Sequence, residues 1–192
     1  MKSPYFMPII LFSLLIAART HYFEYQSNQP KLIHCFSQNT PCFNDYEAGL
    51  RAAKLWEKPA ILMFSGWACV YCQRWVEALY KHPSVLEFME DEFVFIVLNV
   101  DDQTPLPKPI DYIRRNKKKE ILKTTGDKWS SLQIDCYSGN QPKFFLLNSE
   151  KELLVIQAFN YHPNIEKFAA FLEAGLQNFQ HGISEGKMEC GF

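Results

Sequence analysis

The sequence predicts an α/β fold in which one mixed central β-sheet is flanked by helices, with the element order βαβ and then ββα. Two continuous apolar runs, 60–64 and 93–100, are typical of strands buried on both faces. A helical pattern lies between them, and strand, helix, strand in this order implies a right-handed parallel crossover. A third apolar run, 143–147, is followed by a turn and by an apolar stretch over 152–159. This last pattern predicts an antiparallel hairpin.

Length and composition limit the number of domains and the class of partner. The chain has 192 residues, of which 47% are hydrophobic. That is enough for one ordinary core and too little for two comfortable domains. The formal net charge is −1, so a nucleic-acid-binding role, which needs a strong basic excess, is not expected.

The first twenty residues, 1–20, predict an export signal. Lys2 supplies a positive charge, and an uncharged, largely apolar run over 5–18 follows it. As a helix this run spans roughly 21 Å, which is short of the roughly 30 Å hydrocarbon core of a bilayer. The length favours a secretory signal, and an uncleaved signal anchor stays open. Either alternative places the domain outside the cytoplasm, in the periplasm or an equivalent compartment where disulfides persist.

A single folded domain is expected over 44–180, between a polar arm over 21–43 and a short tail over 181–192. Its first helix is predicted to begin at Asn44, because Asn44 and Glu47 have the spacing of a capping box.

The stretch after Cys69 has the spacing of an amphipathic helix. Its apolar stripe consists of Cys72, Trp75, Val76 and Leu79. His82 and Pro83 end this helix, and Ser84 is expected to cap a short helix that runs through Met89.

Residues 101–127 are expected to form an inserted loop region, because three prolines precede the basic run 114–119. The basic run is interpreted as a solvated face, and contact with anionic lipid headgroups is the alternative if an anchor is retained. A short helix is predicted to begin near Lys128, and the spacing of apolar residues over 165–179 predicts a strongly amphipathic last helix.

Cys69 and Cys72 lie where the first core strand turns into a helix. Open α/β sheets place their chemistry at such strand ends. A thiol at a helix N-terminus faces unsatisfied N–H groups and the positive end of the helix dipole, and both favour the thiolate. Cys69 is therefore the expected nucleophile of a thiol–disulfide exchange, and the more shielded Cys72 is placed to attack the mixed disulfide that Cys69 forms.

Two other interpretations of the pair are a structural disulfide and a structural zinc site. A structural disulfide closing so short a loop is worth roughly 2 kcal/mol, which by itself does not exclude a staple. A structural zinc site needs four ligands, commonly as two close pairs, and the chain has one close pair of cysteines. We therefore expect neither a metal nor another cofactor.

Pro142 supports the redox interpretation. A proline just before a core strand is a candidate for a cis peptide bond, although a trans bond at a strand start is the commoner case. In a redox fold this loop would lie against the cysteine pair, and Gln141 would offer its backbone groups to an extended substrate. Trp67, beside the pair, is a further candidate for positioning the substrate.

Several segments, in order, match a known pattern: "NDYEAGLRAAK", "GWACVYC", "NVDD", "TGDKWSSLQ", "NQPKFFLLN" and the last helix. From about Phe43 to Phe179 the chain resembles the carboxy-terminal, thioredoxin-like domain of the bacterial thiol:disulfide interchange protein DsbD. The resemblance implies a thioredoxin fold, an attacking Cys69, a resolving Cys72 and Pro142 as the cis-proline. It also implies electron transfer to oxidised partner proteins outside the cytoplasm.

The chain departs from that family in two ways. The resembling family carries one acid six residues before the first cysteine and another four residues after the second. At these two positions this chain has Met63 and Val76. Glu77 is one residue off and is expected to point elsewhere. The family's domain also receives its electrons from a multi-helix membrane segment in the same chain, so the donor here is expected to be a separate membrane or soluble protein.

Four cysteines remain. A local disulfide between Cys35 and Cys42 is the expectation in an oxidising compartment, whereas Cys136 and Cys190 either pair or stay free. The sequence therefore predicts an exported, protein-disulfide-reducing oxidoreductase. The alternative is a non-catalytic binding module of the same fold in which the disulfide between Cys69 and Cys72 is structural.

Overall fold

The computed structural model describes residues 33–34, 41–137, 140–155, 159–160 and 162–187, all of which belong to one compact unit, Leu32–Phe192. The predicted export signal and most of the arm over 21–43 lie outside the described residues. Within the part of the chain that the structure describes, no helix is both long and apolar enough to cross a bilayer.

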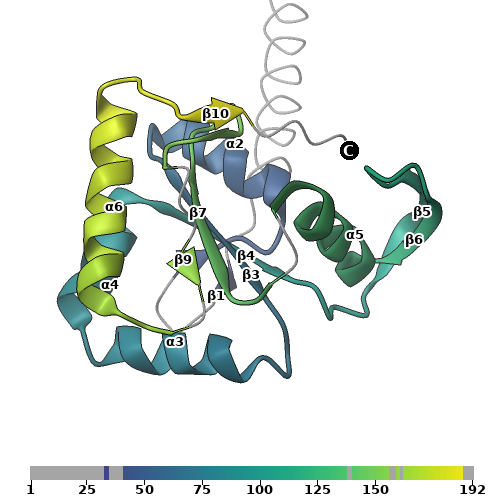
Figure 1. Cartoon of the computed structure of the whole chain (residues 1–192), viewed down its shortest axis with the longest axis horizontal. Coiled ribbons are helices and arrows are strands. Elements are labelled where there is room, and N and C mark those ends of the chain that lie inside the picture. Colours follow the sequence, from purple (N-terminus) through teal and green to yellow (C-terminus); the bar gives the residue numbers. More distant parts are fainter. Residues whose placement is uncertain (1–32, 35–40, 138–139, 156–158, 161, 188–192) are drawn as a thin grey trace, which may run out of the picture. The chain divides into compact units, whose positions relative to one another are not determined.

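A mixed sheet forms the centre of the fold (Figure 1). Its strands, in spatial order, are β10 (Gly186–Lys187), β8 (Glu152–Leu153), β7 (Lys143–Leu147), β3 (Ala60–Ser65) and β4 (Val94–Asn99), and β9 (Phe159–Asn160) also pairs with β7. β3 and β4 are parallel, with Ala60 opposite Val94, and β3 and β7 are antiparallel, with Ala60 opposite Leu147. The predicted mixed sheet and its parallel crossover are thus confirmed.

Helices cover both faces of this sheet. Successive strand residues point to opposite faces, so Leu62 and Phe64 pack with α2 (Tyr46–Trp56) and α5 (Thr125–Leu132), whereas Met63 faces the other layer. That other layer consists of α3 (Val70–Tyr80), α4 (Pro83–Glu92) and α6 (Ile165–Gln180). In Figure 1 α4 and α6 lie on one side of β3 and β7, and α5 lies on the other. The arrangement is consistent with a thioredoxin-like fold.

Two predicted helix starts are displaced, that of α2 by one residue and that of α4 by two. The N-cap of α2 is Asp45 rather than Asn44, because the Asp45 carboxylate accepts a hydrogen bond from the Ala48 backbone N at 2.8 Å. The N-cap of α4 is His82 rather than Ser84, so the helix begins at Pro83, and it runs to Glu92, past the predicted end at Met89. Proline suits the first helical position because its fixed φ is helical and its missing N–H would have no partner there.

The prediction of an inserted loop over 101–127 is wrong. β5 (Pro105–Ile113) and β6 (Lys119–Thr124) form a two-stranded antiparallel hairpin. Its pairing shifts register between Pro105 and Ile110 and is regular from Ile110 to the tip. Pro107 and Pro109 lie inside this irregular stretch. They therefore interrupt no regular pattern of hydrogen bonds between the two strands.

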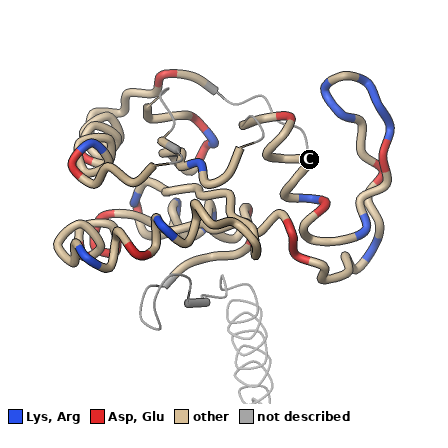
Figure 2. Tube along the Cα trace, turned by 60° about the horizontal axis from the view of Figure 1, so that its bottom comes forward, with Lys and Arg blue, Asp and Glu red and all other residues tan. Residues whose placement is uncertain are grey.

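The basic run forms the tip of this hairpin, where Figure 2 shows Lys and Arg grouped. Residues 115–119 are exposed, which fits both the predicted solvated face and its alternative, contact with lipid headgroups. Arg114 is the exception, since its side chain is 17% exposed and its Nε donates to Glu120 at 2.6 Å.

Two further segments differ from expectation. The predicted strand over 152–159 is interrupted: β8 meets β7 only at Leu153, opposite Leu147, and β9 pairs with the other end of β7. Part of the arm is regular, because β1 (Ile33–His34) and β2 (Pro41–Cys42) pair antiparallel.

A buried tyrosine pair predicts a loss of stability at high pH. The hydroxyl oxygens of Tyr46 and Tyr137 lie 2.9 Å apart, in a hydrogen bond. Burial raises the pKa of Tyr46 to about 12 and raises that of Tyr137 well above its ordinary value. Since both folded-state values exceed the value of about 10 in an unfolded chain, the folded state keeps protons that the unfolded state loses. The free energy of unfolding should therefore fall as pH rises from 10 through 12.

Urea unfolding between pH 8 and the alkaline limit measures this effect. The double variant Y46F/Y137F should show a smaller decline of stability with pH than the wild type. Y80F, which changes an exposed tyrosine, should keep the wild-type decline. An unchanged decline in the double variant would contradict the assignment to this pair.

Candidate active site

The cysteine pair lies at the junction between β3 and α3. Cys69 is the N-cap of α3, and its sulfur accepts a hydrogen bond from the Cys72 backbone N at 3.1 Å. The two cysteines form a disulfide, so the structure is that of the oxidised pair. Cys69 is half-buried, whereas Cys72 is 4% exposed and packs in the core layer that includes Met63 and Trp75. The predicted placement of an accessible first and a shielded second cysteine is confirmed.

An aspartate that follows β4 holds the loop in front of Cys69. The Asp101 carboxylate accepts a hydrogen bond from the Trp67 backbone N at 3.0 Å. A Cβ on Gly66 would lie 2.6 Å from that carboxylate and 2.8 Å from the Gln141 side-chain oxygen. Glycine at this position therefore allows two polar side chains to approach the loop backbone closely.

The loop of Pro142 lies at the same end of β3. The Gln141–Pro142 peptide bond is cis, and Lys143, the next residue, pairs with Phe64 near the end of β3. Pro142 is buried and Gln141 is half-buried. The structure thus brings the predicted catalytic and substrate-positioning residues, Trp67, Cys69, Cys72, Gln141 and Pro142, to one end of the sheet.

A buried glutamine, which the sequence analysis missed, supports this loop. Gln133 begins the π-helical turn η1 (Gln133–Tyr137) and is 3% exposed. Its side-chain nitrogen donates to the Asn140 carbonyl oxygen at 2.8 Å, and its side-chain oxygen accepts from Gln141 at 3.4 Å. A signal was available, since Gln133 ends the quoted "TGDKWSSLQ" segment.

The surface around the disulfide is apolar. Trp67 is 73% exposed, and Val70 and Tyr71, the two residues between the cysteines, are 56% and 41% exposed. Scattered exposed apolar residues are ordinary, but these three all lie within two positions of Cys69 in the chain.

A pocket of about 680 Å³ opens beside Cys72. Val76 and Trp129 form apolar parts of its lining, and Asp102 contributes a carboxylate, which accepts a hydrogen bond from the Thr104 backbone N at 2.9 Å. Glu77 is also among the residues that line this pocket. Val76, at one of the two places where the resembling family has an acid, lines the same pocket as Cys72.

The segment that supplies Trp129 has a structural role. Thr124 and Asp127 form a capping box at the start of α5, which begins three residues before the predicted start near Lys128. A Cβ on Gly126 would lie 2.6 Å from the Val100 carbonyl oxygen, so the helix start packs directly on the backbone that follows β4. This contact helps to fix one wall of the pocket beside Cys72.

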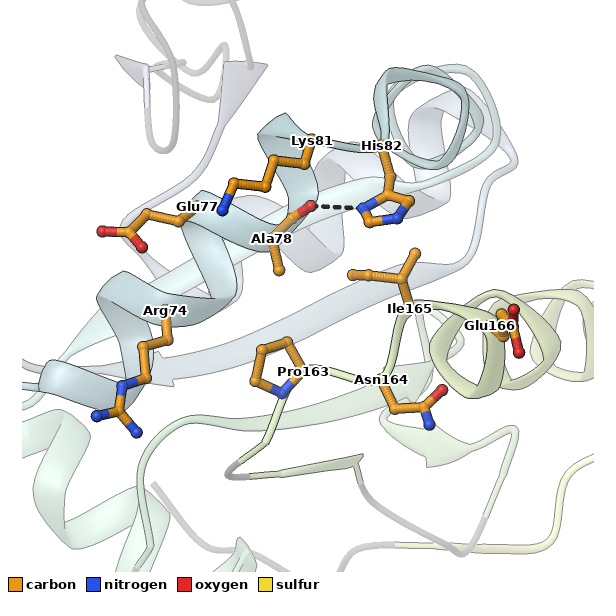
Figure 3. A pocket seen from close by; sticks show the side chains of 9 residues that line it. All are labelled: Arg74, Glu77, Ala78, Lys81, His82, Pro163, Asn164, Ile165 and Glu166. Atoms are coloured by element: carbon orange, nitrogen blue, oxygen red, sulfur yellow. Dashed lines mark hydrogen bonds between the residues drawn. The ribbon is translucent and has the colours of Figure 1, made fainter.

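A second pocket, of about 510 Å³, lies between α3 and the start of α6 (Figure 3). Its lining mixes cationic Arg74 and Lys81 with anionic Glu77 and Glu166, and the described lining residues include no cysteine. His82 contacts the Ala78 carbonyl oxygen through Nδ1 at 2.8 Å. Mixed charge without a reactive group indicates no particular chemistry for this pocket.

Metal ligation and the remaining cysteines were also considered. Within the described ranges, no group of three or more His, Cys, Asp and Glu residues could hold a metal ion. Cys42 and Cys136 are each disulfide-bonded. Cys35 and Cys190 lie outside the described residues, so the predicted pairing of Cys35 with Cys42 stays a prediction.

Comparisons with known proteins give a weak structural likeness. No protein-family model matches the chain, and no curated protein matches it. A solved structure described as a thioredoxin-fold protein from Helicobacter pylori is similar, with a TM-score of 0.44 and 19% sequence identity. The match covers 64% of this chain and 72% of the other.

Proposed function

We propose that the protein is an extracytoplasmic thiol:disulfide oxidoreductase that reduces disulfides of partner proteins through Cys69 and Cys72. The observation that supports this most directly is the disulfide at the start of α3, with the Cys69 sulfur accepting the Cys72 N–H. In the reduced protein the same N–H and the helix dipole stabilise a thiolate on Cys69.

The reaction is two successive exchanges. The Cys69 thiolate attacks one sulfur of the substrate disulfide, a mixed disulfide forms, and the other substrate sulfur leaves as a thiolate and takes a proton. The Cys72 thiol then loses its proton and attacks the Cys69 sulfur, which releases the second substrate thiol and forms the disulfide seen in the structure. Two electrons pass to the substrate. A separate membrane or soluble dithiol protein then reduces the disulfide between Cys69 and Cys72 again.

The resemblance to DsbD's carboxy-terminal domain supports a reducing role outside the cytoplasm, and so does the export signal predicted over 1–20. Trp67, Gln141 and Pro142 are proposed to position the substrate. A retained, membrane-anchoring signal is the alternative to cleavage. Amino-terminal sequencing of protein isolated from a cell fraction decides between them.

A non-catalytic binding module is the second candidate, and one observation favours it. Met63 is fully buried and Val76 is aliphatic, so neither place where the resembling family has an acid supplies a proton acceptor. The apolar surface around the disulfide would then serve binding alone.

Trapping with C72S separates the two candidates. Without the resolving thiol, an active protein should accumulate a mixed disulfide at Cys69, which mass spectrometry of cross-linked peptides can identify. C69S is the matched control, because it also loses the intramolecular disulfide and should trap nothing. If neither variant traps a partner and the reduced wild type does not reduce a model protein disulfide, the binding module is favoured.

Cys69 should alkylate faster than any other thiol of the reduced protein. Cys69 is half-buried, whereas Cys72 is 4% exposed, and the Cys69 sulfur accepts a backbone N–H. Timed alkylation with iodoacetamide, followed by peptide mass spectrometry, measures the rates. If Cys72 or Cys136 reacts first, the assignment of the nucleophile is wrong.

A further inference from the structure

The β5–β6 hairpin concentrates positive charge. Residues 105–124 contain seven Lys and Arg and two Asp and Glu, a formal charge of +5, whereas the whole chain is −1. Figure 2 shows these cations along the hairpin and at its tip, and in Figure 1 the hairpin lies beyond α5, away from the central sheet. The positive charge is thus presented on one projecting element.

One face of the hairpin attaches it to the rest of the domain. Leu122 is buried, and so is Tyr112, whose hydroxyl donates to the Asp135 carboxylate at 2.6 Å. Arg114 and Glu120 form an ion pair on this same face, because strand residues two apart point the same way. This face has its partners within the chain.

The opposite face exposes two aliphatic side chains beside several cations and one aspartate. Ile113 and Ile121 are 63% and 59% exposed. Ile113 pairs with Lys119 and Ile121 pairs with Asp111, so all four side chains share the outward face. Lys123, two residues beyond Ile121, extends it, and the exposed tip over 115–118 adds further cations.

We propose that this outward face docks the domain on the surface of an anionic lipid bilayer. Clustered Lys and Arg are attracted to anionic headgroups in proportion to their number. Ile113 and Ile121 lie among these cations, which suits a boundary where headgroups meet acyl chains. The positive charges are spread over the hairpin tip and both strands. They suit a partner whose negative charge is spread over a surface better than a partner with a single pair of carboxylates. The proposal does not depend on the redox activity of Cys69 and Cys72.

Lysine footprinting of the full chain tests the docking locally. The protein is bound to vesicles of phosphatidylcholine alone or of phosphatidylcholine with phosphatidylglycerol, then labelled briefly with an amine-reactive ester and digested. Labelling of Lys117, Lys118 and Lys119 should fall several-fold only with phosphatidylglycerol, and high salt should reverse the fall. Lys54 and Lys167, which are exposed elsewhere, are internal controls that should not change.

Because labelling is measured at individual lysines, binding of vesicles through residues 1–20 would not by itself protect the lysines of the hairpin. The variant I113S/I121S should lose part of the protection, whereas I183S, which changes an exposed isoleucine outside the hairpin, should keep it. Equal labelling in both kinds of vesicle overturns the proposal. Equal protection by soluble polyglutamate also overturns it, because the partner would then be an acidic polypeptide rather than a lipid surface.

Discussion

Replacing Cys69 with serine is expected to abolish reduction of protein disulfides, with a loss of at least about 10³-fold, since removal of an activated nucleophile costs orders of magnitude in rate. The thiolate is the attacking species in disulfide exchange, and a serine hydroxyl remains protonated at neutral pH. Cys69 is the less buried residue of the pair, and its sulfur accepts the Cys72 N–H. Steady-state reduction of a model protein disulfide, driven by a small dithiol, measures the loss.

The variant C72S distinguishes loss of the nucleophile from loss of a structural bond. Both single variants remove the same disulfide, worth roughly 2 kcal/mol for so short a loop. They should therefore unfold at similar denaturant concentrations. C72S should still form a mixed disulfide in a single turnover, whereas C69S should not. Full activity in C69S would show that another thiol is the nucleophile.

The core of the fold was predictable because its signals are local and strong. The runs that became β3, β4 and β7 are continuous and apolar, and the helical spacing of α3 and α6 is long enough to exceed competing patterns. The hairpin was not predictable in the same way. Its regular pairing begins only at Ile110, after a proline-rich stretch, and it depends on Tyr112 and Leu122 packing against the domain.

In the candidate site, too, residues marked by local sequence signals were predictable and long-range contacts were not. Cys69, Cys72 and Pro142 were predictable because each is marked by its place beside a strand. The supporting contacts were not, since the hydrogen bond from Trp67 to Asp101 joins residues 34 apart in the chain. Contacts across such distances depend on how elements pack, and a single sequence does not contain that information directly.

The environment of Cys72 predicts slow release of the mixed disulfide near neutral pH. Its thiol must lose a proton while 4% exposed, and burial in apolar surroundings disfavours the thiolate. A nearby carboxylate acting as general base is typically worth about 10²–10⁴-fold in rate. Met63 and Val76 stand where the resembling family has such acids, and neither can accept the proton. Release should therefore speed up as pH rises.

The variant V76E should recover part of that rate near neutral pH. Val76 is half-buried, lies one helical turn beyond Cys72 and lines the same pocket, so a carboxylate there would share a solvent-filled space with the thiol. The stability cost of a half-buried acid should be modest compared with that of an acid at Met63, which is fully buried. Single-turnover release of a mixed disulfide, followed against pH, measures the effect, and V76Q is the control of matched shape without the charge.

A fast, pH-independent release in the wild type would contradict this prediction. It would mean that another group already accepts the proton, and the pocket beside Cys72 contains two carboxylates, those of Glu77 and Asp102. E77Q and D102N then identify which one acts, because only the variant that removes the acceptor should slow release at neutral pH and restore its rise with pH. Equal rates in V76E and V76Q would show that a carboxylate at this position does not reach the thiol, because the two variants differ only in their capacity to take the proton.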